Sequence, residues 1–259
     1  MQTTTVARFL DSVASLFPDD RLTYQKGIPT FHPESASEAG LFISQANDFG
    51  QKLFITGFGN NIDPVGDRFA RIVSIRNDRL NAIISCEEQA LRVEVGSGFP
   101  LRELNIKLRG TATFNPMAAL PYVGSVGGAI AVGLSADRSV RSTTSAPVSI
   151  SRFLLGLTVV TPTGEIRTIG TSDNKSSSQE DFARAYSPSW GLLGFIVSAT
   201  LRLLPDSAHS EWRGLKQRGI DQEQFLANLR DENSYLGKVR AKFDSRELFP
   251  IFRAKESSE

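Results

Sequence analysis

Hydrophobic and polar positions follow two different spacings along the chain. Two segments carry apolar residues at helical spacing, 1–17 and 39–49. Other apolar runs are short and lie between turn residues, as buried or half-buried strands do. In the first part of the chain, these expected strands are 52–56, 71–75 and 80–84.

The second part of the chain contains more strand-like segments. Residues 91–95 alternate between apolar and polar side chains, and 101–108 form an expected helix closed by Gly110. The turn Pro162-Thr163-Gly164 predicts a hairpin between 155–161 and 165–169. The remaining expected elements are a short helix at 181–186, a long strand at 192–204 ended by Pro205, and a helix at 221–230 in a charged tail. This order predicts an α+β protein of two packed subdomains.

Composition excludes several classes of function. The chain has 259 residues, 40% of them hydrophobic, and a formal net charge of +1, so nothing favours nucleic acid or an anionic membrane as a partner. Cys86 is the single cysteine, and His32 and His209 are the two histidines. This set supplies neither a disulfide framework nor the usual ligands of a metal centre.

The sequence pattern also shows no targeting signal. The N-terminal segment has Asp11 in its middle and does not resemble a signal peptide, and apolar runs such as 153–160 are too short to span a bilayer. We therefore expect a cytoplasmic protein without membrane insertion.

Two glycine-rich turns are the strongest chemical signal. Thr56-Gly57-Phe58-Gly59-Asn60-Asn61 directly follows an expected buried strand, and a second cluster runs from Gly124 to Gly133. Glycines allow backbone N–H groups to converge on an anion, and they let a large flat ligand approach the chain closely. Taken singly, each cluster is equally compatible with a plainer role, which is an ordinary tight turn at Gly57 and Gly59 and close helix packing at Gly127-Gly128. Neither matches the Rossmann fingerprint or the phosphate loop of NTPases.

Taken together, these turns resemble a known family from about residue 33 to residue 205. The chain resembles the FAD-binding domain of the vanillyl-alcohol oxidase and p-cresol methylhydroxylase group. The segments that carry the resemblance are 55–61, 95–98, 123–131, 155–165 and 191–205. Within the group, residues 132–138 look most like the short FAD-binding subunit of bacterial glycolate oxidase.

The resemblance implies a two-subdomain fold. A small parallel sheet with helices would occupy about 20–85, and a larger, mostly antiparallel sheet with helices would occupy about 86–205. The FAD-binding domain would then be 1–205. Residues 206–259 would be a short tail with one helix, too small to form a full substrate domain.

The resemblance also implies how FAD would be held. The loop 57–61 would wrap the pyrophosphate with backbone donors, and the second cluster would line the pyrophosphate and the flavin side, with Ser125 donating a hydrogen bond. Ala131 and Ser135 would approach the flavin ring, and Ile196 with Val197 would flank the adenine. The full set of implied cofactor-binding residues is Thr56, Gly57, Phe58, Gly59, Asn60, Asn61, Pro121, Gly124, Ser125, Gly127, Gly128, Ala131, Ser135, Ile196 and Val197. The first loop has no histidine and Cys86 is not in an attachment motif, so we expect noncovalent FAD.

Several residues depart from the family pattern or fit a plainer role. Phe58 replaces a small residue, so the loop must open differently or the ring must point away. His32 and His209 are expected at the surface or in turns rather than as catalytic bases, and catalytic residues stay unassigned. Tyr122 is expected to be a wall of the cleft, and Trp190 to pack in the core beneath the cofactor.

Three functions stay open at this point. The leading one is an FAD-binding oxidoreductase component, similar to the glycolate oxidase subunit, that oxidises a hydroxy acid or alcohol. A partner subunit would supply the substrate domain or take up the electrons. The second is a non-catalytic flavin-binding protein. The third is a reductase like UDP-N-acetylenolpyruvoylglucosamine reductase, whose proton-donating serine we cannot place in this chain.

Overall fold

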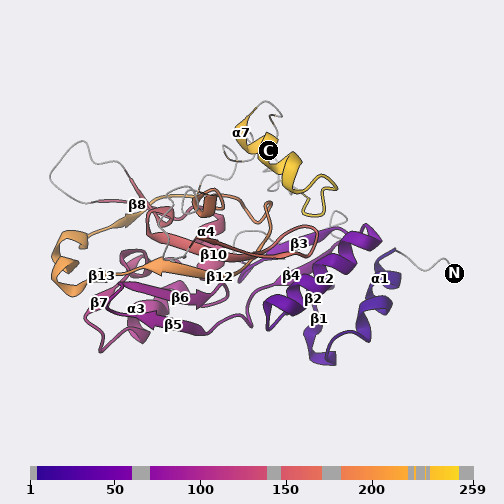
Figure 1. The fold of residues 1–259 in the computed structure, drawn as a ribbon, viewed down its shortest axis with the longest axis horizontal. Helices are drawn as coiled ribbons and strands as arrows, with labels where there is room; N and C mark the ends of the chain where they lie inside the picture. The colour runs from indigo at the N-terminus through magenta and orange to yellow at the C-terminus, as the bar shows by residue number, and fades with distance from the viewer. Residues whose placement is uncertain are drawn as a thin grey trace.

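The computed structural model describes residues 5–59, 71–138, 147–170, 182–220, 225, 231 and 234–250. The N-terminal elements form one end of the molecule, and the larger sheet forms the other (Figure 1). Helix α7 (Tyr235–Phe243) lies above the junction between these two parts.

The first sheet is small and has strand order β1-β2-β4-β3. Its strands are β1 (Leu22–Gln25), β2 (Ile28–Phe31), β3 (Leu53–Thr56) and β4 (Val73–Arg76). β4 runs parallel to both β2 and β3, while β1 and β2 form an antiparallel hairpin. The carboxyl end of β3 therefore leads directly into the first glycine turn.

Two helices accompany this sheet, α1 (Thr5–Ala14) and α2 (Ala36–Phe49). Ser35 caps α2 by accepting a hydrogen bond from the backbone N–H of Glu38, and Gly50 ends it in the left-handed conformation with φ of 64°. Since α2 also packs against the larger sheet, it joins the two parts of the molecule.

The second sheet is antiparallel, with strand order β11-β10-β12-β6-β5. Its strands are β5 (Ile83–Glu87), β6 (Arg92–Gly96), β10 (Leu154–Val160), β11 (Ile166–Gly170) and β12 (Phe195–Arg202). Helix α4 (Val126–Ala131) packs against β12 and β6. This packing places the second glycine cluster beside the sheet.

The other described elements are short. They are η1 (Asp19–Arg21), η3 (Leu101–Glu103), α3 (Leu104–Lys107), β7 (Thr113–Phe114), η4 (Pro116–Ala119), β8 (Ser135–Asp137), β9 (Val148–Ser149), η5 (Ile150–Phe153), β13 (Leu204–Pro205), η6 (Asp206–Trp212) and β14 (Lys216–Gln217).

One hydrophobic core is shared by distant parts of the chain. Phe31 and Phe42 stack with ring centroids 4.0 Å apart, and Phe195 of the second sheet belongs to the same buried cluster. Leu248 and Phe249 of the tail complete this cluster. The shared core fixes the two sheets and the tail relative to one another.

The α+β class with a parallel-containing sheet and a larger antiparallel sheet is confirmed. The change from the first sheet to the second falls between β4 and β5. Among the residues that the structure describes, no helix combines the length and apolar character needed to cross a bilayer.

Several expected boundaries are wrong. The β1–β2 hairpin was not expected, and its turn places Lys26 and Gly27 at positive φ of 49° and 80°. The strand expected at 80–84 begins only at Ile83, because Leu80 closes a turn by donating a hydrogen bond from its N–H to the carbonyl of Asn77. The helix expected at 101–108 is a 3-10 turn followed by the short α3.

The C-terminal third differs as well. The strand expected from residue 192 begins at Phe195, after Gly194 with φ of 150°. Helix α7 was not expected, because its sequence lacks a strong apolar stripe. The helix expected at 221–230 lies outside the described residues except for Phe225.

Candidate cofactor-binding site

The structure brings the two glycine turns face to face. Gly57 follows β3, and Ser125 directly precedes α4. A Cβ atom added at Gly57 would lie only 2.9 Å from Ser125 Oγ, so the absence of a side chain permits this approach.

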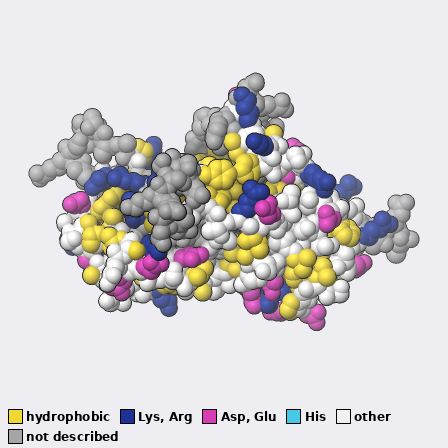
Figure 2. Space-filling view, in the orientation of Figure 1, with side chains coloured by type: hydrophobic (Ala, Val, Ile, Leu, Met, Phe, Trp, Pro, Cys, Tyr) yellow, Lys and Arg dark blue, Asp and Glu magenta, His cyan; other side chains and the backbone are white. Residues whose placement is uncertain are grey.

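A cleft of about 820 Å³, partly open to solvent, lies between the turns. Ten of the expected site residues line it: Thr56, Gly57, Phe58, Gly59, Gly124, Ser125, Gly127, Gly128, Ala131 and Ile196. Apolar side chains gather in the middle of the visible face, below α7 (Figure 2).

Three expected residues lie outside the lining of this cleft, Pro121, Ser135 and Val197. Val197 follows Ile196 on β12, and since successive strand residues face opposite sides, it joins the hydrophobic core instead. Ser135 lies in β8, where it pairs with Ser149 of β9. Asn60 and Asn61 lie outside the described residues.

Other lining residues were not assigned to the cofactor from the sequence. They are Phe54, Ile55, Asn77, Tyr122, Val123, Val132, Trp190, Gly191, Gly194 and Phe195. The position of Phe54 and Ile55 directly before the first turn, and of Gly191 and Gly194 within a resembling segment, could have pointed to them. Nothing in the local sequence points to Asn77, because it reaches the cleft only through the conformation of the turn after β4.

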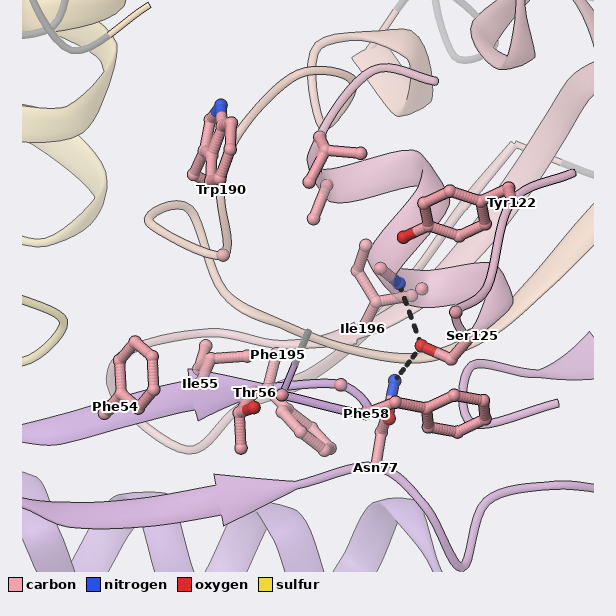
Figure 3. A pocket seen from close by; sticks show the side chains of 18 of the residues that line it. Phe54, Ile55, Thr56, Phe58, Asn77, Tyr122, Ser125, Trp190, Phe195 and Ile196 are labelled. Atoms are coloured by element: carbon pink, nitrogen blue, oxygen red, sulfur yellow. Dashed lines mark hydrogen bonds between the residues drawn. The ribbon is translucent and has the colours of Figure 1, made fainter. Parts of the chain in front are cut away.

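The polar end of the cleft is organised around Ser125. Ser125 is 1% exposed and caps α4, and its Oγ accepts a hydrogen bond from the Gly128 N–H at 3.1 Å. Asn77 donates a second one from Nδ2 at 3.4 Å (Figure 3). Tyr122 lies close by, since a Cβ added at Gly128 would be 3.1 Å from its hydroxyl oxygen. Tyr122 is therefore a wall of the cleft at this end.

A charged network supports the first glycine turn from behind. Arg76 donates a hydrogen bond to the carbonyl of Phe58 at 3.4 Å, and its Nε lies 3.5 Å from Asp78 Oδ2. His32 Nδ1 lies 2.7 Å from Asp78 Oδ1. Burial opposes ionisation of Asp78, but the hydrogen bond from His32 and the charges of His32 and Arg76 outweigh it and hold the pKa of this carboxyl below its usual range.

His32 is thus not a surface residue, because it is 4% exposed, and it does not line the cleft. Its buried ring is explained by the polar partners on both nitrogens, Asp78 and Thr23. His209 is exposed and packs against Phe114, with ring centroids 4.9 Å apart.

Phe58 lines the cleft without filling it. Its ring lies beside Ser125 and Asn77, at the polar end (Figure 3). The loop thus accommodates the bulky residue while the cleft stays open.

The opposite end of the cleft is apolar and includes Phe54, Ile55, Trp190 and Phe195. Trp190 has a positive φ of 52°, and its backbone N–H donates a hydrogen bond to the carbonyl of Ala131 at 2.8 Å. Its ring packs against Phe225 with a centroid distance of 6.1 Å. Trp190 therefore lines the cleft as well as packing against the tail.

The residues present fit a dinucleotide flavin better than a metal. The described residues contain no group of three or more His, Cys, Asp or Glu side chains that could hold a metal ion. The cleft instead combines apolar walls with a glycine-opened polar end, where the buried Asn77 Oδ1 has no hydrogen-bond partner among the described residues. Such an end suits the hydroxyl and phosphate groups of a nucleotide.

Sequence comparison agrees with this geometry. The family described as "FAD binding domain" matches residues 29–170, more than half of the chain. A D-lactate dehydrogenase of Anaerostipes hadrus is 26% identical over 191 residues, which cover 72% of this chain and 39% of that protein. A D-arabinono-1,4-lactone oxidase of Yarrowia lipolytica (strain CLIB 122 / E 150) is 25% identical over 181 residues, which cover 68% of this chain and 32% of that protein. The match thus covers only 32–39% of the length of these relatives.

Solved structures share the fold. An alkyldihydroxyacetonephosphate synthase matches with a TM-score of 0.58 at 18% identity, over 76% of this chain and 41% of the other. A variant of Phl p 4, a glucose oxidase, matches with a TM-score of 0.57 at 15% identity, over 76% of this chain and 44% of the other. The chain belongs to the FAD binding domain family of the vanillyl-alcohol oxidase and p-cresol methylhydroxylase group, whose oxidoreductases use FAD as cofactor.

Proposed function

We propose that this chain is the FAD-binding component of an oxidoreductase that oxidises a hydroxy acid or an alcohol, similar to the short subunit of glycolate oxidase. The single observation that carries this proposal is the cleft where the two glycine turns meet. The similarity to a D-lactate dehydrogenase supports a 2-hydroxy acid as the substrate class. When bound, FAD supplies a ring that accepts a hydride from the substrate carbon.

Within this proposal, the chain binds and orients the cofactor. The backbone of the first turn and the Ser125 hydroxyl hold the pyrophosphate, and Gly124, Gly127 and Gly128 let the ligand lie against α4. Ala131 and Ile196 contact the apolar parts of the ligand. We also propose that FAD is held noncovalently, because the described lining contains neither histidine nor cysteine.

We propose further that residues 1–205 act as the FAD-binding domain, with the tail packed on it. The described lining residues include no carboxylate, imidazole, lysine or arginine side chain. A proton acceptor for the substrate hydroxyl would then come from outside this lining, and we propose that a partner subunit supplies it or takes up the electrons. We place this activity in the cytoplasm.

The same observation favours a second candidate, a flavin-binding protein without turnover. A cleft that binds FAD but has no carboxylate, imidazole, lysine or arginine side chain among its described lining residues would hold the cofactor and leave a substrate unreacted. The two candidates differ in whether bound flavin is reduced by a substrate.

An absorption experiment tests both candidates. The purified chain, loaded with FAD and desalted, is expected to retain the visible flavin bands and to release all flavin into the supernatant on acid precipitation. Anaerobic mixing with D-lactate, glycolate and other 2-hydroxy acids, with and without cellular partners, should then bleach these bands. Absence of retained flavin contradicts FAD binding, whereas retained flavin that no substrate bleaches supports the second candidate.

A further inference from the structure

Asn77 is a buried polar residue of the cleft that the family resemblance did not assign. It lies in the turn that follows β4 and is 5% exposed. Its side chain lines the cleft opposite α4 and points toward Ser125, which is 48 positions away in the sequence (Figure 3).

The hydrogen bonds of Ser125 define the direction of its hydroxyl hydrogen. A serine hydroxyl has two acceptor lone pairs and one donor hydrogen. Ser125 Oγ accepts from the Gly128 N–H at 3.1 Å and from Asn77 Nδ2 at 3.4 Å. Both acceptor positions are thus used, and the hydrogen is left to donate into the cleft. Asn77 makes Ser125 a donor, which is the role that an anionic ligand requires.

The oxygen atom of the Asn77 side-chain amide is not satisfied by the part of the chain that the structure describes. Asn77 Oδ1 is buried and has no hydrogen-bond partner among the described residues. A buried acceptor without a partner is destabilising, because burial removes its hydrogen bonds to water without replacing them, so such groups call for a specific explanation. A hydroxyl group of a bound ligand would satisfy this oxygen.

Backbone hydrogen bonds hold the main chain of Asn77 in place. The Asn77 N–H donates to the carbonyl of Thr56 at 3.4 Å, and the Asn77 carbonyl accepts from the Leu80 N–H at 2.9 Å. A Cβ added at Gly127 would lie 2.9 Å from Asn77 Nδ2. The glycine at this position therefore gives room to the Asn77 side chain as well as to a ligand.

We propose that Asn77 is a binding and positioning residue for the dinucleotide. Its Nδ2 group turns the Ser125 hydroxyl toward a ligand phosphate, and its Oδ1 accepts a hydrogen bond from a sugar hydroxyl of the same ligand. This inference rests on the proposed FAD binding. The hydroxyl belongs either to the ribityl chain or to the ribose, because both carry hydroxyl groups and they flank the pyrophosphate.

Calorimetric titration of the 259-residue apoprotein with FAD, FMN and ADP tests the proposal. Asn77→Ala removes both hydrogen-bonding groups, and Asn77→Asp keeps the size of the side chain but removes the donor. Asn81→Ala is the matched control, because Asn81 is exposed and lies outside the described lining of the cleft. Thermal melting of each variant separates loss of folding from loss of binding, and Asn77→Asp carries the test if Asn77→Ala does not fold.

For FAD, we expect Asn77→Ala to raise Kd about tenfold to hundredfold. Asn77→Asp should raise it at least as much, because its carboxylate would capture the Ser125 hydrogen and repel the phosphates. Asn81→Ala should leave Kd within about twofold. A greater loss for FMN than for ADP assigns the hydroxyl to the ribityl chain, and the reverse assigns it to the ribose.

A double-mutant cycle with Ser125→Ala tests the positioning role. If Asn77 acts partly through Ser125, the two substitutions together should raise Kd less than the product of their separate factors. If folded Asn77 variants bind FAD as the wild type does, the inference is overturned while the proposed function stands. If the Asn77 substitutions weaken the binding of FAD, FMN and ADP by the same factor, the contact between Asn77 Oδ1 and a sugar hydroxyl is overturned. If the effects of the Asn77 and Ser125 substitutions on Kd multiply independently, the positioning role is overturned. A wild-type chain that binds no FAD overturns both the inference and the proposed function.

Discussion

The two ends of the cleft are built on different principles. At the polar end, buried groups from distant turns meet through directed hydrogen bonds at Ser125 Oγ. At the apolar end, Trp190 and Phe54 provide surface, and Trp190 also packs on Phe225 of the tail. Directed contacts tolerate little displacement, whereas apolar contacts depend on area and shape. We therefore expect the polar end to control cofactor affinity and the apolar end to contribute mainly to stability.

The largest effect is expected from Gly127→Ala at the polar end. The added methyl would lie 2.8 Å from Ser97 Cβ and 2.9 Å from Asn77 Nδ2, so both neighbours must move. We expect a loss of about 1–3 kcal/mol in the free energy of unfolding, from overpacking, and a rise in the FAD Kd of about hundredfold. Calorimetric titration and denaturant unfolding measure the two quantities.

Gly219→Ala is the control for this substitution, since a Cβ there meets no atom within 4 Å. It should change neither stability nor affinity appreciably. If Gly127→Ala binds FAD as tightly as Gly219→Ala does, the polar end does not control affinity.

An intermediate effect is expected from Trp190→Ala at the apolar end. Loss of the half-buried ring and of its contact with Phe225 should lower the free energy of unfolding by about 1–2 kcal/mol. The FAD Kd should rise by about tenfold or less, because the hydrogen bonds at Ser125 are untouched. Trp190→Phe keeps an aromatic ring and should recover most of the stability. A larger loss of affinity for Trp190→Ala than for Gly127→Ala would reverse the assigned roles of the two ends.

The smallest effect concerns Asp78, which supports the polar end through Arg76. Because the folded-state pKa of Asp78 lies below its unfolded value, its contribution to stability is present above about pH 4 and is lost as the pH falls through the folded-state pKa. Asp78→Asn should therefore flatten the fall in melting temperature between about pH 5 and pH 3, with a cost of about 1 kcal/mol or less at pH 7. Asp11→Asn, on the exposed side of α1, is the control. An unchanged acid slope in Asp78→Asn would show that this network does not support the turn.

Local sequence was sufficient for the elements that carry short-range signals. Gly57 after the apolar run of β3 and the turn at Gly164 were identified because strand patterns and glycine turns are encoded within a few residues. The β1–β2 hairpin escaped this reading, since the first residue of its turn is a left-handed Lys26, followed by Gly27, rather than the Asn or Asp that usually precedes glycine in such turns. Helix α7 escaped it because its apolar residues form only a weak stripe.

The sequence by itself determined the fold class, the two glycine turns and the family, all of which depend on residues that are near one another in the chain or that occur in a fixed order. Only the tertiary structure decided that Asn77 meets Ser125, that Trp190 lines the cleft and that Val197 turns away from it. These contacts join segments separated by tens of residues, and their geometry follows from how the two sheets pack around a shared core. A local sequence pattern does not encode such long-range contacts, because the sequence of a segment does not specify which distant segment it packs against in the folded protein.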